Sequence, residues 1–91
     1  MSTLVSIDAQ RRRSFFEIIA QILSACHTNT KKTTLMNHCS MSSTQLTRYL
    51  DLMLGARLLL IEGNSPYSVF RISGKGRDFV KAYERLKSLM K

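Results

Sequence analysis

The stretch that decides the fold is SSTQLTRYLDLMLGA, residues 42–56. Ser42 followed by Gln45 has the Ser-x-x-Gln spacing of a capping box, in which the serine hydroxyl caps the first turn of a helix. Apolar side chains then recur with a helical period, at Leu46, Leu50, Met53 and Leu54. The stretch therefore predicts a helix that is capped by Ser42, carries one apolar face and ends near Gly55.

A β-hairpin is expected directly after this helix. The run LLLI at residues 58–61 is shorter than a typical helix and has the length of a strand. Residues 62–66, EGNSP, form a turn cluster. Residues 67–72 then alternate, with Ser68, Phe70 and Ile72 on one side of a second strand. Two short strands across a Gly/Asn turn predict a hairpin.

A last helix should begin after Ser73, a good N-cap residue, and run to the end of the chain. Its apolar stripe has successive spacings of three, four, three and four residues: Gly76, Phe79, Tyr83, Leu86 and Met90. This spacing is typical of a coiled-coil seam. Because the stripe is short, packing on the core of the same chain is the alternative.

Two further helices are expected before residue 42. Residues 1–7 form an N-terminal arm, and Asp8 should cap a first helix. The apolar residues of that helix are spaced three and four apart: Phe15, Phe16, Ile18, Ile19, Ile22, Leu23 and Cys26. The polar segment CHTNTKKTT, residues 26–34, predicts a loop. A short helix over about residues 33–39 should then bury Leu35, Met36 or both.

The resulting order is helix, short helix, capped helix, hairpin, helix. The 91 residues leave room for one domain, which we place at residues 8–91. We predict an α+β winged helix-turn-helix with three helices, a two-stranded hairpin wing and a C-terminal helix. In proteins with this motif, the second helix of the helix-turn-helix lies in the major groove of DNA.

The charge balance points to the same class of partner. Fourteen Lys and Arg oppose six Asp and Glu, which gives a net charge of +8 and a field that attracts polyanions. An anionic membrane surface is the rival partner, but it would need a basic amphipathic helix. No stretch is long and apolar enough to span a bilayer, and residues 1–7 lack the features of a signal peptide. We expect a cytoplasmic, nucleoid-associated protein.

The candidate DNA contacts lie mainly at the start of the third helix, where small polar and basic side chains can approach phosphates and base edges. These candidates are Ser42, Ser43, Thr44, Gln45, Thr47 and Arg48. The free amides at the start of the second helix favour an anion, which adds Lys31, Lys32 and Thr33 as phosphate contacts.

The hairpin and the first helix offer further candidates. Asn64, Ser65 and Tyr67 could touch the minor groove or the backbone, and Arg71 could reach a phosphate. The run Arg11, Arg12 and Arg13 is either a solvated helix face or the source of one or two phosphate contacts.

Five segments together resemble a family of small, basic archaeal winged-helix proteins: RRRSFFEIIAQIL, KKTTLM, SSTQLTRYLDLM, LLLIEG and FRISGKGRDFV. They cover roughly residue 12 to the C-terminus. The most specific parts are Lys32-Thr33, Gln45-Leu46 with Tyr49-Leu50, and the pattern Ile72-Ser73-x-x-Gly76-Arg77-x-Phe79. The resemblance implies DNA binding, as a chromatin-type protein or as a regulator.

The same resemblance implies a mode of dimerisation, because better-known members pair through a long antiparallel coiled coil of the last helix. This chain departs from them in its short last helix, which ends at Lys91, and in Arg57, where the family usually has Gly. We expect a two-fold homodimer whose contacts are Phe79, Tyr83, Leu86 and Met90. A monomer that buries both apolar stripes in its own core is the alternative.

The dipeptides Cys26-His27 and His38-Cys39 invite a zinc interpretation. Adjacent helical residues point about 100° apart, and structural zinc ligands are usually separated by two to four residues. We therefore predict no metal. A Cys26–Cys39 disulfide is a second interpretation, and the leading one is two small buried hydrophobic side chains.

The sequence does not suggest an enzyme. It lacks a phosphate-cradling Gly loop, a nucleophile elbow and paired carboxylates in a pocket-like context, and it suggests neither a cofactor nor a small-molecule ligand. The main hypothesis is double-stranded DNA binding, as a regulator at specific sites or as an abundant architectural protein. A winged helix that binds only other proteins is the alternative, and RNA binding is a third.

Overall fold

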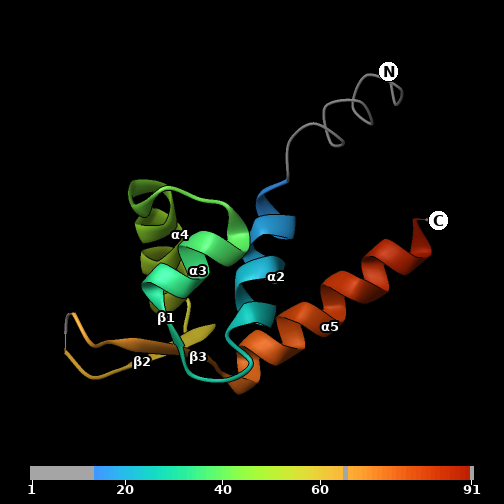
Figure 1. The fold of residues 1–91 in the computed structure, drawn as a ribbon. Helices are drawn as coiled ribbons and strands as arrows, with labels where there is room; N and C mark the ends of the chain where they lie inside the picture. Colours follow the sequence, from blue (N-terminus) through green and yellow to red (C-terminus); the bar gives the residue numbers. More distant parts are fainter. Residues whose placement is uncertain (1–13, 65, 91) are drawn as a thin grey trace.

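The computed structural model describes residues 14–64 and 66–90 of the chain (Figure 1). The described elements are, in chain order, α2 (Phe15–Ala25), β1 (Thr30–Lys31), α3 (Lys32–Cys39), α4 (Ser43–Gly55), β2 (Leu59–Glu62), β3 (Val69–Ile72) and α5 (Gly74–Leu89). This order matches the predicted one, with β1 added.

The sheet has three antiparallel strands in the order β1-β3-β2. The hairpin pairs β2 with β3 in the register Leu59↔Ile72 to Glu62↔Val69. On its other edge, β3 pairs with β1 in the register Thr30↔Phe70. The prediction of a loop over residues 26–34 is therefore wrong at residues 30 and 31. A two-residue polar strand has no periodicity of its own, and only its partner makes it a strand.

α2 begins later than predicted. Ser14 is its N-cap, with extended backbone, and the Ser14 hydroxyl accepts a hydrogen bond of 3.1 Å from the amide of Glu17. The prediction that this helix starts at Asp8 is wrong for this reason. Asp8 itself, the arm at residues 1–7 and Arg11, Arg12 and Arg13 lie outside the described residues.

α3 and α4 end in the same way. Ser40 after α3 and Arg57 after α4 have left-handed backbone, with φ of 53° and 62°. The next residue then donates its amide to a carbonyl five positions back, Met41 to Met36 and Leu58 to Met53. This is the six-to-one hydrogen bond of a Schellman motif. Arg57, where the resembling family usually has Gly, thus adopts a left-handed backbone that glycine reaches without a steric penalty.

One hydrophobic core joins all the longer elements. Its fully buried side chains include Ile22 and Leu23 of α2, Leu35 of α3 and Leu46 of α4. Leu35 is thus buried as predicted, whereas Met36 only packs partly buried against the core. The alternation in β3 is also confirmed, because Phe70 and Ile72 are buried and Arg71 is exposed.

The ends of four elements meet at the Leu58 carbonyl. Its oxygen accepts the Ser73 amide at 3.0 Å and lies 3.0 Å from the Ser73 hydroxyl. That hydroxyl also accepts the amide of Gly76 at 3.0 Å, so Ser73 caps α5 as predicted. Gly76 is buried so close to this carbonyl that a Cβ atom there would overlap the Leu58 oxygen and lie 2.8 Å from Ile72.

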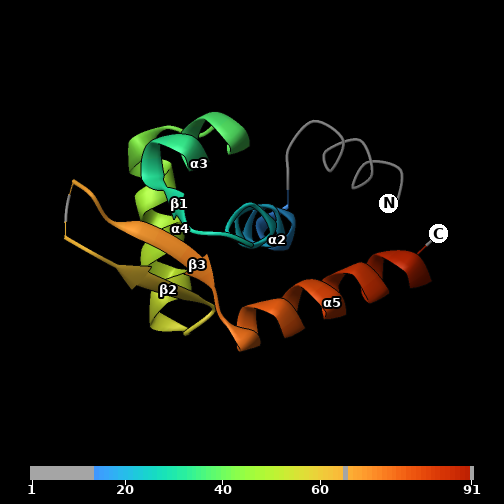
Figure 2. The ribbon, with the colours of Figure 1, turned by 60° about the horizontal axis from the view of Figure 1, so that its bottom comes forward.

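The long axis of the molecule separates two ends. α3, α4 and the β2–β3 hairpin gather at one end, and α5 leads away from the sheet toward the other (Figures 1 and 2). The extents are 46 × 26 × 19 Å. α2 lies between the two, where it packs against both α3 and α5.

Cys26 and Cys39 are buried thiols in the core, which agrees with the leading interpretation of two small hydrophobic side chains. Burial, together with the nearby Cys39, raises the pKa of Cys26 from 9.0 to about 12. No group of three or more metal-ligating side chains occurs within residues 14–64 and 66–90.

Replacement of Gly76 by alanine is expected to lower the free energy of unfolding by about 2 kcal/mol, because the backbone must shift to admit the Cβ atom. For a domain of this size, that loss lowers Tm by roughly 8–16 °C. Gly74→Ala is the matched control, since a Cβ at Gly74 meets nothing within 4 Å. Thermal unfolding by circular dichroism measures both variants, and equal Tm values for the two would contradict the close approach.

Stability above pH 9 is expected to depend on Cys26. The unfolded thiol loses its proton near pH 9, while the folded thiol keeps it until about pH 12. The unfolded state then binds fewer protons, so the free energy of unfolding falls by about 1.4 kcal/mol per pH unit over this window.

Urea unfolding of the wild type and of Cys26→Ala from about pH 8 to about pH 11 tests this linkage. The stability advantage of the wild type over the variant should shrink as the pH rises, while contributions from Lys and Tyr cancel in the difference. An advantage that stays constant across this range would contradict the raised pKa.

Candidate nucleic-acid interface

The candidate interface is built on α4. Its buried residues Leu46, Leu50 and Met53 face the core, as the apolar stripe predicted. Ser43, Thr44, Gln45 and Arg48 are exposed on the other side. With the exposed N-cap residue Ser42, five of the six predicted contacts at the start of α4 are thus open to solvent.

Ser42 has a capping role. Its hydroxyl accepts the Gln45 amide at 3.2 Å, which satisfies one of the free amides in the first turn. The Gln45 side chain returns to the same hydroxyl, with Oε1 3.4 Å from Oγ, and not to the Ser42 amide as in a complete capping box. Ser42 therefore fixes the start of the helix that carries the other candidates.

Thr47 and Lys32 form a link between α3 and α4. The ammonium group of Lys32 donates to the Thr47 hydroxyl at 2.6 Å, and that hydroxyl donates to the Ser43 carbonyl at 2.8 Å. Both residues are half-buried. The link holds the positive charge of Lys32 beside the first turns of α4 and leaves Thr47 with its hydroxyl engaged on both sides.

The start of α3 is the second cluster of candidates. Lys31 is the N-cap residue and makes no side-chain capping bond, so its side chain satisfies none of the first amides of α3. Lys31 and Thr33 are exposed. Lys32 reaches α4 through its bond to the Thr47 hydroxyl, and Lys31 and Thr33 flank Lys32 in the sequence.

The turn between β2 and β3 has a defined shape. Gly63 has a φ of 82°, and the Tyr67 amide donates to the Asn64 carbonyl at 2.7 Å. Asn64 is exposed, and Tyr67 is 78% exposed. Ser65, the remaining candidate of the turn, lies outside the described residues.

Arg71, which the sequence suggested as a phosphate contact, has an acidic neighbour. Its guanidinium lies 3.8 Å from the carboxylate of Glu62 across the hairpin, and both side chains are largely exposed. A pair this exposed contributes little to stability. It does place a negative charge beside the one basic side chain of the hairpin strands.

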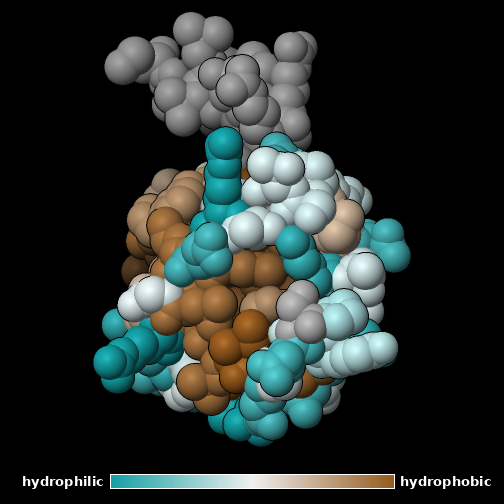
Figure 3. Space-filling model, turned by 90° about the vertical axis from the view of Figure 1, so that its left-hand side faces the viewer, coloured by the Kyte–Doolittle hydropathy of each residue, from teal (hydrophilic) through white to brown (hydrophobic). Residues whose placement is uncertain are grey.

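The end of the molecule that carries α4 and the hairpin also has an apolar component, which sequence reasoning missed. Figure 3 shows hydrophobic side chains gathered near the centre of this face, with hydrophilic side chains around them. Its elements α4 and β2 carry three exposed large hydrophobic residues: Leu52, Leu60 and Ile61. Gln45, Arg48, Tyr49 and Leu52 recur at helical spacing and, with Phe15, line a hollow of about 310 Å³. The spacing was visible, but the contact with Phe15 of α2 was not.

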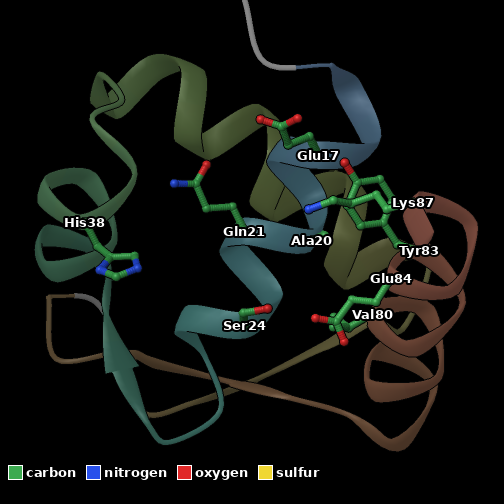
Figure 4. A pocket seen from close by; sticks show the side chains of 9 residues that line it. All are labelled: Glu17, Ala20, Gln21, Ser24, His38, Val80, Tyr83, Glu84 and Lys87. Carbon is green, nitrogen blue, oxygen red and sulfur yellow. The ribbon is translucent and has the colours of Figure 1, made fainter. Parts of the chain in front are cut away.

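A different pocket lies on the α5 side, away from the α4 face. It has a volume of about 430 Å³ and is lined by residues of α2 and α5 and by His38 of α3. Glu17, Glu84 and His38 come from three different elements, and Figure 4 shows His38 across the pocket from both carboxylates. The pocket thus offers dispersed polar groups and no close acid–base pair among its lining residues.

α2 covers only part of the predicted dimer contacts. Phe79 is half-buried, and its ring lies 6.2 Å from that of Phe16. Tyr83 is also half-buried, whereas Leu86 is 56% and Met90 80% exposed. The first half of the seam therefore packs partly within the chain, and the second half stays exposed.

Within the described residues, none of the helices is both long and apolar enough to cross a membrane.

Comparison with known proteins agrees with this architecture. Residues 12–91 match the model of a family described as winged helix-turn-helix. Among solved structures, Sso10a-2, a DNA-binding protein from Sulfolobus solfataricus, has a similar fold, with a TM-score of 0.78 at 20% sequence identity over 86% of this chain and 82% of that one. No curated protein sequence matches the chain. The family match, which spans nearly all of the chain, shows that this protein belongs to the winged helix-turn-helix family.

Proposed function

We propose that this protein binds double-stranded DNA, with α4 in the major groove. The observation that carries the proposal is the exposed polar face at the start of α4, flanked by the linked Lys32. Small side chains such as Ser43 and Thr44 let the helix approach the groove, and Gln45 and Arg48 are long enough to reach base edges. The net charge of +8 supplies the long-range attraction.

Phosphate contacts would flank the helix. Lys31, Lys32 and Thr33 present two positive charges and a hydroxyl at the start of α3, where the positive end of the helix dipole favours an anion. In the hairpin, Asn64, Ser65 and Tyr67 are proposed to touch the backbone or the minor groove, with Arg71 as a further phosphate contact. Ser42 and Thr47 support α4 through the bonds described above and would contact DNA at most through their remaining lone pairs.

The relatives support the same proposal. The chain shares its family with winged helix-turn-helix domains, and Sso10a-2, which shares its fold, is described as a DNA-binding protein. An architectural protein and a regulator differ in whether base edges are read. The exposed Gln45 and Arg48 favour base reading, so we propose sequence preference in addition to electrostatic binding. Neither a cofactor nor catalysis is part of the proposal.

The exposed apolar side chains at the α4 end favour a second candidate function, the binding of a protein partner. Leu52, Leu60 and Ile61 would suit a protein partner, since charged residues are depleted at the centre of protein interfaces. They also suit thymine methyl groups in the major groove. The basic charge of the protein favours the contact with DNA over the contact with a protein.

Arg48→Ala is expected to weaken duplex binding about tenfold or more, because a well-formed contact to a base is worth about 1–3 kcal/mol. Arg57→Gly is the matched control. It removes the same charge from the end of α4, at a left-handed residue that glycine accommodates. Gel shifts with several duplexes, single strands and RNA at two salt concentrations measure both variants.

The pattern of loss then separates the possible roles of Arg48. A loss of preference between duplexes indicates base reading, and a uniform loss indicates a phosphate contact. If about six basic groups meet phosphates, log affinity should fall against log salt with a slope of roughly −5. A slope near zero, or equal effects of Arg48→Ala and Arg57→Gly, would contradict the proposed role of α4.

We also propose a homodimer in which the second copy covers the exposed half of the α5 seam. Phe16, Phe79, Ala82, Tyr83 and Leu86 line an apolar groove of about 200 Å³ between α2 and α5. The adjoining Leu89 and Met90 are 72% and 80% exposed. A neighbouring α5 would shield these side chains and set two α4 helices about one DNA turn apart.

Light scattering of the wild type is expected to give twice the 10.4 kDa mass of one chain. Leu86→Glu should return the mass to that of one chain, because it places a charge in the apolar groove. Ser88→Glu adds the same charge on the opposite side of α5 and should leave the dimer intact. A wild-type mass of one chain at micromolar concentration would exclude this dimer.

A further inference from the structure

α5 carries a second charged surface that the proposed function does not use. Arg77, Lys81 and Arg85 are spaced four residues apart and are all exposed. Helical geometry places them in one row, on the side of α5 opposite to Phe79, Tyr83 and Leu86. We call this row the α5 basic stripe.

The charges of the stripe are not neutralised by ion pairs. In the part of the chain that the structure describes, the ion pair within 4.0 Å is Arg71–Glu62. Asp78 and Glu84 lie on the same helix as the stripe, yet neither carboxylate approaches it that closely. A solvated helix face of a stable domain usually carries alternating charges that support one another. Here three positive charges lie in one row, and although Asp78 and Glu84 are three residues from Lys81 on the helix, none of the three charges is in an ion pair within 4.0 Å.

The stripe also borders a groove. Arg77 and Lys81 form one wall of a hollow of about 360 Å³ between α2 and α5, with Val80 and Glu84. The other wall is formed by the last turn of α2 and the turn that follows it, where Ser24 and His27 respectively are exposed. The groove thus offers two cations, a hydroxyl and an imidazole against one carboxylate, a balance that favours an anion.

The spacing of the stripe fits a nucleic-acid strand. Arg85 follows Arg77 by eight positions, which is about 12 Å along the helix axis. The charges of the row recur about every 6 Å along α5, so a polyanion with regularly repeated charges, such as a strand of duplex DNA, can meet more than one of them. Duplex DNA is therefore a polyanion that the stripe can contact at more than one phosphate.

The position of the stripe separates it from α4. α5 runs away from the end of the molecule that holds α3, α4 and the hairpin (Figures 1 and 2). The molecule is 46 Å long, whereas one helical turn of duplex is only about 34–36 Å long. A duplex segment seated on α4 does not extend over the length of α5 unless more DNA is present.

We propose that the α5 basic stripe contacts the phosphate backbone of duplex DNA outside the footprint of α4, so that a long duplex is held at two places. This inference rests on the proposed binding of DNA by α4. It assigns Arg77, Lys81 and Arg85 to backbone contacts without sequence preference. The apolar seam on the other side of α5 remains available for a second copy.

The test compares two variants of the full chain that lose the same charge from the same helix. Arg77→Gln with Lys81→Gln removes two charges of the stripe. Lys75→Gln with Lys87→Gln removes two exposed charges of α5 outside it. Circular dichroism establishes that both fold. Affinity is then measured against salt for a duplex of about one helical turn, roughly 34–36 Å long, and for one of several turns.

For the long duplex, the stripe variant is expected to have a salt slope shallower than that of the wild type by about 2, because two phosphate contacts are lost. For the short duplex, it should behave like the control variant. Equal slopes for the two variants on the long duplex would overturn the inference, and so would an equal change on both duplexes. If the wild type binds neither duplex, the proposed function itself fails.

Discussion

The structure depends on the close approach of Gly76 to the carbonyl of Leu58. At this point the end of α4, both strands of the hairpin and the start of α5 come together, and the Ser73 hydroxyl lies 2.7 Å and 3.0 Å from two successive carbonyls of the α4–β2 connection. A hydrogen bond of 2.8 Å from the Ile72 amide to the Cys26 carbonyl adds the end of α2. The orientation of the hairpin relative to α4, and hence the shape of the candidate DNA surface, follows from this junction. The sequence pattern around Ser73 and Gly76 that resembles the archaeal family lies at this junction. One of its residues, Gly76, stands where any side chain would force the backbone to shift.

The sequence predicted α4 and α5 well, because their caps and apolar faces depend on residues close to one another in the chain. Ser42 and Ser73 cap α4 and α5 because a hydroxyl three residues before a free amide satisfies it in any context. The spacing of the apolar residues along α4 likewise predicted which face of the helix is buried, because that spacing is a local property of the sequence. β1 could not be predicted, because Thr30 and Lys31 become a strand only through Phe70 and Val69. The start of α2 was placed too early, since Asp8 and Ser14 are equally good caps and the periodicity begins only at Phe15.

The candidate site shows the same division. Exposure of Thr44, Gln45 and Arg48 follows from helical period alone. The role of Thr47 does not, because it depends on Lys32, fifteen positions away, reaching across from α3. The hollow beside Arg48 likewise depends on Phe15, whose ring lies 5.8 Å from that of Tyr49. Contacts between elements therefore decide which polar residues of α4 are available to a ligand and which support the helix.

The pairing of Thr30 with Phe70 has a consequence for how the chain folds. α3 and α4 contact each other and their neighbours in sequence, whereas α2 packs not only against α3 but also against the distant α5. The sheet closes only when β3 inserts between β1 and β2, because β3 is the central strand. Non-local closure of this kind carries the loop entropy that slows folding. Because β3 supplies both pairings of the sheet, residues in the last third of the sequence are needed to complete it, and we expect this non-local closure to slow folding.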